Sequence, residues 1–199
     1  MTARELVISK ADAAERQLCT AIWLWFQDMD PVSIHGLATA ALKVLWRLHQ
    51  RFGTGYRTFE ETMLEDFIRA DKRKEVIEIC NATANFIKHS DKDPFAFHKF
   101  NPESTIFVMV DASSALQALN GRLPMECQAL HAWMAVHHAD LFKQDDPHVQ
   151  ARLALVSGLR GTLASKSDFY QQYIKMTQRA TAQAAAMHKP SDLPLQSFK

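Results

Sequence analysis

Helical periodicity between strong capping signals constrains the fold of this 199-residue chain more than any other feature. Between these signals, apolar residues recur every three or four positions, as an amphipathic helix requires. Residues typical of helix starts and ends separate the segments: Ser9, Asp30-Pro31, Gly53, Thr58 with Glu61, Asn101-Pro102 and Asn120-Gly121. There is no internal repeat, heptad run or convincing strand pattern. The sequence therefore predicts an all-α fold, a single-domain helical bundle of about seven to eight helices.

The predicted helices cover most of the chain. Their approximate ranges are 10–27, 31–51, 58–68, 74–89, 101–120, 124–142, 147–163 and 167–187. The first two should pack as an antiparallel hairpin, because only a few residues separate them. The segment 95–100 is expected to be an extended loop whose phenylalanines fill the core. We expect residues 1–188 to form the domain and 189–199, with two prolines and little to bury, to form a flexible C-terminal tail.

The amino-acid composition limits the classes of function that this chain could have. With 47% hydrophobic and 23% charged residues, the chain resembles ordinary globular proteins. Its formal net charge of +1 creates no whole-protein field toward nucleic acid or anionic lipid, so such binding requires a local patch. The three cysteines are odd in number and distant in sequence, which favours reduced packing residues over disulfides or a zinc site.

The sequence contains no recognisable targeting or membrane segment. Its N-terminus lacks the apolar core of a signal peptide. The longest apolar run, 21–26, is far shorter than the roughly 20 residues of a membrane-spanning helix. We therefore expect a cytoplasmic protein with no membrane partner.

The stretch 81–94, NATANFIKHSDKDP, is the main candidate site. At 100° per residue, the helix that contains it gathers apolar and small residues on one side, and polar residues on the other. Asparagine is a poor helix former, yet two of them lie one turn apart on the polar side. The candidate binding residues are Asn81, Asn85, Lys88, His89, Asp91 and Asp93, together with His35. A solvated surface face is the alternative interpretation of the same pattern.

The Asn85-Phe-Ile-Lys-His89 segment, late in a predicted helix, resembles the end of the motif of HEPN-type domains. These are small helical modules of prokaryotic toxins, defence nucleases and their inactive relatives. Active members carry an arginine directly before the asparagine, and this chain has Ala84 there. The resemblance therefore implies a non-catalytic module that binds RNA or a protein partner, in phage defence or a toxin–antitoxin system. Three segments are also similar to a group of uncharacterised bacterial helical proteins: 15–18, 30–35 and 85–94.

Two other function classes remain open. His35, His89 and Asp91, with Asp93, suit an enzyme with a metal or acid–base site, although His-x-Asp-x-Asp before a proline is also typical of a capping loop. A self-associating structural protein, such as a homodimer, is the other alternative, with an interface formed by Trp23, Trp25 and Trp46. No phosphate-binding glycine loop or nucleophile motif is present, so we expect no nucleotide or other cofactor.

Overall fold

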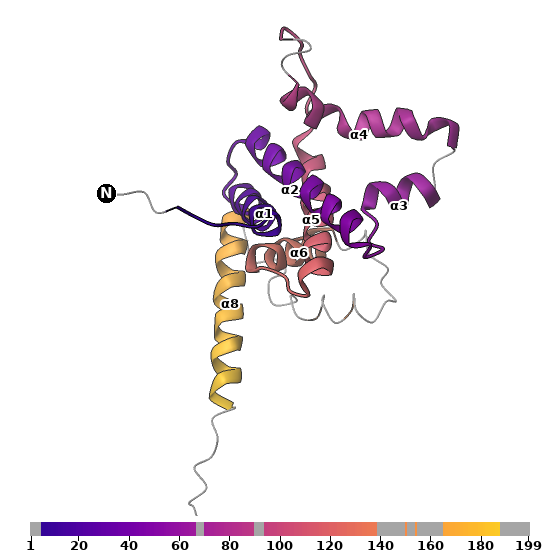
Figure 1. Ribbon diagram of the computed structural model, residues 1–199. Helices are drawn as coiled ribbons and strands as arrows, with labels where there is room; N and C mark the ends of the chain where they lie inside the picture. The colour runs from indigo at the N-terminus through magenta and orange to yellow at the C-terminus, as the bar shows by residue number, and fades with distance from the viewer. Residues whose placement is uncertain are drawn as a thin grey trace, which may run out of the picture.

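The computed structural model describes residues 5–66, 70–89, 94–138, 150, 154 and 165–187. In this part of the chain all regular structure is helical and no strand occurs, which confirms the predicted all-α bundle (Figure 1). The α-helices are α1 (Lys10–Phe26), α2 (Pro31–Phe52), α3 (Phe59–Asp66), α4 (Arg73–Lys88), α5 (Thr105–Asn120), α6 (Met125–His137) and α8 (Lys166–Met187). Two 3-10 turns, η1 (Ala70–Lys72) and η2 (Pro102–Ser104), precede α4 and α5.

The predicted capping signals form the expected contacts. Ser9 and Asp12 make a reciprocal capping box at the start of α1. The Asp30 carboxylate accepts a hydrogen bond of 2.8 Å from the backbone N–H of Ser33. Gly53 ends α2 with a φ of 61°, a left-handed conformation that glycine adopts without steric cost. These local signals explain why the helix boundaries follow from the sequence.

Two boundaries differ from the prediction. Helix α6 ends at His137, not near residue 142, because the next residue, His138, has left the helical conformation (φ −130°, ψ 39°). Helix α8 begins at Lys166, one residue before the predicted start at 167, and is capped by Ser165, whose hydroxyl accepts a 3.1 Å hydrogen bond from the N–H of Asp168. The predicted helix 147–163 and the tail 189–199 fall on residues outside the described ranges, apart from positions 150 and 154.

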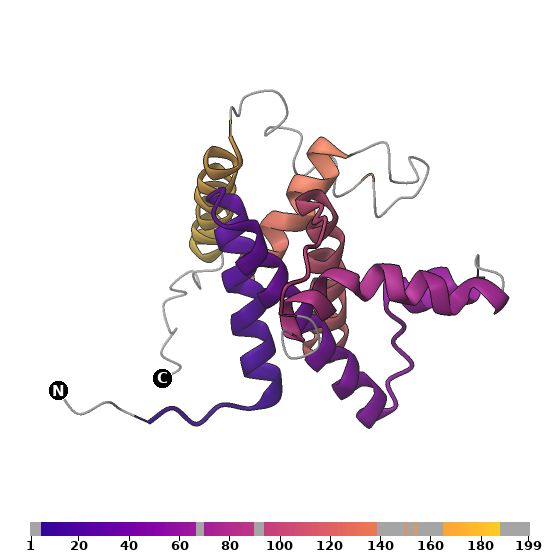
Figure 2. The ribbon, with the colours of Figure 1, turned by 90° about the horizontal axis from the view of Figure 1, so that it is seen from above.

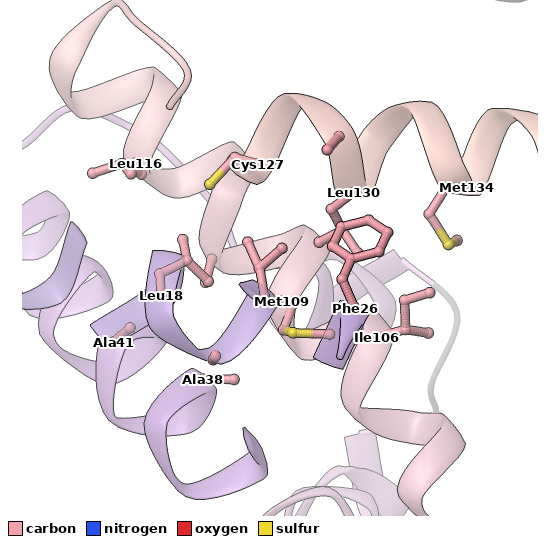
Figure 3. Close-up of a cluster of buried hydrophobic side chains, with 14 of the residues drawn as sticks. Leu18, Phe26, Ala38, Ala41, Ile106, Met109, Leu116, Cys127, Leu130 and Met134 are labelled. Atoms are coloured by element: carbon pink, nitrogen blue, oxygen red, sulfur yellow. The ribbon is translucent and has the colours of Figure 1, made fainter. Parts of the chain in front are cut away.

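The main core lies between α1, α2, α5 and α6, with α8 packed across one end (Figures 1 and 2). Figure 3 shows the side chains that converge from these helices, among them Leu18, Ala38, Met109 and Leu130, all fully buried. Helices α1 and α2 are in extensive contact, as predicted for consecutive helices with a short connection. Each large aliphatic side chain buried in this way contributes roughly 1.5–3 kcal/mol to folding.

An aromatic cluster joins α8 to this core. Phe26 of α1 stacks on Tyr170 at a centroid distance of 4.9 Å, and Trp25 meets Trp133 edge to face at 5.5 Å. Phe169 lies 5.1 Å from Trp133. Pairs in these geometries add roughly 0.5–1.5 kcal/mol beyond their buried area.

Helices α3 and α4 form an arm on one side of the bundle, away from α8 (Figures 1 and 2). The arm contacts the bundle mainly where α4 meets α2. The prediction that the phenylalanines of segment 95–100 fill the core was wrong for two of them, because Phe95 and Phe97 are exposed. Phe100, in contrast, is partly buried and packs against His35.

Within the described ranges, no helix combines the length and the apolar character needed to cross a bilayer.

Candidate functional site

Polar and titratable side chains lie close together where α2 and α4 meet, whereas the packing around this contact is apolar. On α2, His35, Thr39 and Lys43 are spaced four residues apart and so share one face. On α4, Ala84 is buried and Lys88, four residues later, lies on the same side of the helix. We call these five residues the α2–α4 seam.

His35 is the most buried polar residue of the seam, with only 4% of its surface exposed. Its Nδ1 lies 3.0 Å from Thr105 Oγ1 on α5, and its ring meets the Phe100 ring edge to face at 5.3 Å. Its Nε2 is buried and has no hydrogen-bond partner. Burial lowers the pKa of His35, and His98 and Lys43 add smaller contributions in the same direction, so the neutral form is favoured. His35 is therefore a hydrogen-bonded histidine at the edge of the core.

His98 connects the segment after α4 back to the helix. Its Nε2 lies 2.7 Å from Thr83 Oγ1, and its ring stacks on Phe86 with centroids 5.3 Å apart. The extended segment is thereby held along the last two turns of α4. As a result, the segment around His98 lies close to Phe86.

The other end of the seam brings like charges together. The Lys43 ammonium has a lowered pKa, first because it is half-buried and second because Lys88 lies near it. Glu60 of α3 faces the same region, where burial raises the pKa of its carboxyl group. The Glu60 carboxylate accepts a 3.3 Å hydrogen bond from the Asn81 amide. This corner therefore contains two ammonium groups and one carboxylate.

The residues of the predicted polar face of α4 differ in how far they are exposed to solvent. Asn81 does not face solvent but is half-buried, and it also donates to the Ile77 carbonyl oxygen at 3.0 Å. Asn85 and Lys88 are exposed, whereas His89 is half-buried just after the helix, with its N–H bonded to Asn85 O at 3.0 Å. The two aspartates of the candidate site, Asp91 and Asp93, lie outside the described residues.

The opposite face of α4 is less buried than its apolar pattern suggests. Ala84 is the buried residue of this face, and the side chain of Thr83 is engaged with His98. Ile77 and Ile87 are each 40% exposed. Because Ala84 is buried at the seam, an arginine in its place would have to displace neighbouring side chains.

A second polar network fastens the arm to α5. The Asp111 carboxylate, buried in an otherwise apolar helix, accepts hydrogen bonds from the Tyr56 hydroxyl (3.0 Å) and the Phe59 N–H (3.0 Å). Burial raises the pKa of Asp111 and also that of Tyr56. Each of these polar groups serves to anchor the segment that leads into α3.

His49 extends this network by stacking on Tyr56, with ring centroids 4.6 Å apart. Its Nε2 lies 2.8 Å from the carbonyl oxygen of Ala115. Because a carbonyl can only accept, Nε2 carries the proton, and Nδ1 accepts from the Thr54 hydroxyl. His49 therefore serves as a structural cross-link between α2, α5 and the turn after α2.

A pocket of about 160 Å³ opens between the end of α1 and the starts of α2 and α8. The Lys166 ammonium occupies its polar side, 4.4 Å from the centroid of Trp25 and 2.8 Å from an Asp28 oxygen. These contacts satisfy the cation within the chain. The pocket does not include His35 or His89, the residues around which the sequence suggested an enzyme site.

The described ranges contain no group of three or more His, Cys, Asp or Glu side chains able to hold a metal ion. The predicted ligands Asp91 and Asp93 are not among these residues. Cys19 and Cys127 are both free thiols, on α1 and α6.

Sequence reasoning missed four residues of this region: Lys43, Glu60, His98 and Thr105. Lys43 offered one signal, because it lies eight residues after His35 and therefore on the same helix face. Glu60 and His98 offered none, since their positions depend on how the arm and the segment after it fold back onto α2.

Comparisons of the chain with protein-family models, with curated proteins and with solved structures found no match.

Proposed function

We propose that this chain is a non-catalytic helical module that binds a protein partner through the outer side of its arm. The observation that carries the proposal is a run of exposed apolar residues, which we call the docking face. Phe86 and Ile87 near the end of α4 are 44% and 40% exposed, Phe95 is 87% exposed, and Phe97 is fully exposed.

Single exposed apolar residues are ordinary, but a group of this kind is not. The four side chains fall within 12 residues, and the His98 contacts with Thr83 and Phe86 hold the segment around His98 beside the end of α4. Covering such a surface with a partner would remove large aromatic side chains from water. Apolar burial of this type is the main driving force of protein association.

The chemistry of the docking face favours a protein over RNA. Phenylalanine is enriched in the centres of protein interfaces, where charged residues are depleted. RNA binding requires an additional positively charged track for the phosphates. Lys74 and Lys88 on α4 are exposed, but Glu78 is exposed on the same helix and reduces the local positive charge.

The HEPN-like relationship, and with it a role in defence, stays a prediction from the Asn85–His89 segment. A homodimer formed through tryptophans also stays a prediction. Of the three tryptophans concerned, Trp23 is 46% exposed, whereas Trp25 packs against Trp133 and the Trp46 indole donates to Glu61 at 2.7 Å. The docking face supports a contact with a partner that does not involve these tryptophans.

The test compares partner capture by the wild-type chain with capture by the double variant Phe95→Ser/Phe97→Ser. Phe52→Ser is the matched control, because Phe52 is equally aromatic and 64% exposed but lies at the end of α2. We expect a specific protein to be retained by the wild type and the control, and lost by the double variant. Equal retention by all three chains would contradict the proposal.

Two further measurements on the same samples separate the alternatives. Sedimentation velocity at increasing concentration detects self-association, which the double variant should abolish if the partner is a second copy. Gel shifts with labelled RNA detect nucleic-acid binding. A salt-sensitive shift with no protein captured would replace the proposed function with RNA binding.

A further inference from the structure

The pocket of about 160 Å³ lies where α1, α2, α5 and α8 come together. Its lining comes from the end of α1 and the turn after it, the start of α2, η2 with the first residue of α5, and the first residue of α8. An apolar cavity of about 150 Å³ holds one benzene ring, so this pocket has room for a ligand of similar size. None of its residues belongs to the docking face or to the α2–α4 seam.

Direct contacts hold the walls of the pocket together. Thr105 lines the pocket, and its Oγ1 lies 3.0 Å from Nδ1 of the buried His35, so this hydrogen bond joins α5 to α2. The Lys166 ammonium donates a 2.8 Å hydrogen bond to Asp28 Oδ1, and this ion pair joins α8 to the turn after α1. The walls are therefore in place before a ligand arrives, as in most small-molecule sites.

The apolar part of the lining is formed by Trp25, Met29, Pro31, Ile34 and Pro102. Ile34 is almost completely buried, whereas the Met29 side chain is 53% exposed. The φ angles of Pro31 and Pro102 are fixed by their rings, so this surface is rigid. A ligand with an apolar body that lies against it removes the Met29 side chain from water, which favours binding.

The charged residues of the lining are Asp28, Glu103 and Lys166. Lys166 is paired with Asp28, and its ammonium also lies 4.4 Å from the centroid of Trp25. Glu103, on η2, is exposed, and the lining supplies no second ammonium for its carboxylate. The lining therefore contains one more carboxylate than ammonium. A ligand with a single positive charge balances this difference.

We propose that this pocket binds a small primary amine with an apolar body. The ammonium group of the ligand pairs with the Glu103 carboxylate, and its body lies against the apolar residues of the lining. The pocket already binds an ammonium group by the same chemistry, since Asp28 and the Trp25 ring hold that of Lys166. Aromatic faces attract organic cations through the negative charge of their π electrons.

The test compares two ligands of nearly the same size, benzylamine and benzyl alcohol, on the full-length chain near neutral pH. Benzylamine is then a cation, because amino groups of this kind titrate well above neutrality. Binding is followed by proton–nitrogen correlation spectra, in which the indole N–H of Trp25 reports on the pocket. Its signal is identified by its absence in Trp25→Phe. We expect a saturable shift with benzylamine and at least about fivefold weaker binding of benzyl alcohol, which lacks the charge-assisted contact.

Three variants locate the charge that matters. Glu103→Gln keeps the length of the side chain and removes its charge, so benzylamine should bind about three to ten times more weakly. Lys166→Gln removes the competing ammonium from Trp25 and Asp28, so benzylamine should bind at least about threefold more tightly. Glu78→Gln is the matched control, because it removes the same charge from an exposed position on α4, and it should bind like the wild type.

Saturable binding of benzylamine, with opposite effects of the two pocket variants, supports the amine site. Equal binding of benzylamine and benzyl alcohol would mean that the pocket recognises only apolar shape, and the proposal is then overturned. It is also overturned if the Trp25 signal shows no saturable shift, or if Glu103→Gln and Glu78→Gln have the same affinity. Circular dichroism of all variants checks that the fold is retained. Capture of a protein by the docking face is measured separately, so failure of one proposal leaves the other standing.

Discussion

The core helices α1, α2, α5, α6 and α8 and the α3–α4 arm have similar amphipathic patterns. Their apolar residues, however, are buried to different extents. In the core, Leu18, Ile22 and Phe26 of α1 are completely buried. In α4, residues of the apolar side, such as Ile77 and Ile87, remain 40% exposed. The difference arises because α1 packs against α2, α5, α6 and α8, whereas α4 contacts mainly α2 and α3. An apolar stripe therefore indicates a surface that needs a partner, and this partner need not be within the same chain.

The two regions also use polar residues differently. In the arm, polar groups form the attachment itself, through the Asp111 network and the α2–α4 seam. In the core, helices meet almost entirely through apolar side chains. We expect the arm to be the less stable region, because few buried apolar contacts hold it.

The largest expected effect is on stability, and it comes from making the same Ile→Ala substitution in the core and in the arm. Ile22→Ala should destabilise the protein by about 2–5 kcal/mol, since it leaves a cavity in a fully packed core. Ile87→Ala should cost less than about 1 kcal/mol, because the side chain is already partly in water. Urea denaturation followed by circular dichroism gives both values. Similar losses for the two variants would mean that the arm is as tightly packed as the core.

The next effect concerns the attachment of the arm. Asp111→Asn keeps the shape of the side chain but replaces two hydrogen bonds to a carboxylate with weaker hydrogen bonds to a neutral amide. We expect a loss of about 1–3 kcal/mol and faster amide exchange in α3. Asp28→Asn, at an exposed ion pair, is the control and should change stability by less than about 1 kcal/mol. Unchanged exchange in α3 would show that the arm has another attachment.

A third prediction concerns pH at the seam. The pKa of His35 is lower in the folded chain than in the unfolded one, because burial disfavours its charged form. The unfolded state therefore takes up the proton first, and the contribution of His35 is complete above about pH 6.5 and lost as the pH falls. The expected slope is at most about 1.4 kcal/mol per pH unit for one proton.

The variant His35→Gln isolates this contribution, because it removes the titrating group and keeps a polar side chain opposite Thr105. Its free energy of unfolding should depend less on pH below neutrality than that of the wild type. The lowered pKa of His137 and the raised pKa values of Glu60 and Asp111 remain in both proteins. They therefore cancel in the difference between the two curves. Parallel curves would show that His35 does not titrate differently on folding.

The smallest expected effect is at the start of α8, on the core side of the comparison. Ser165→Ala removes the cap that accepts from the Asp168 N–H and should cost about 1 kcal/mol. Ser167→Ala should cost only a few tenths, since its hydroxyl makes one long contact of 3.3 Å to Gln27. Thermal denaturation of the pair measures the difference. A larger loss of stability for Ser167→Ala than for Ser165→Ala would show that Ser167 caps α8.

The sequence by itself determined the elements of this fold. Caps such as Ser9, Asp30 and the Thr58–Glu61 box, and the glycine end of α2, act over three or four residues. Their effect can be read from the sequence because all the interacting groups are adjacent in it. The same local reasoning selected Asn81, Lys88 and His35 as residues of interest.

Only the tertiary structure decided how those residues are used. The sequence left open whether Asn81 belongs to a site or to a solvated face, and in the structure it is half-buried and bonded to Glu60. The prediction that Phe97 fills the core was wrong. The contacts of His35 with Thr105 and of Thr83 with His98 join residues 70 and 15 positions apart. Helical periodicity fixes the face on which a side chain lies, but it carries no information about which helix covers that face. That depends on the path of the chain between helices, which here leaves one side of α4 open.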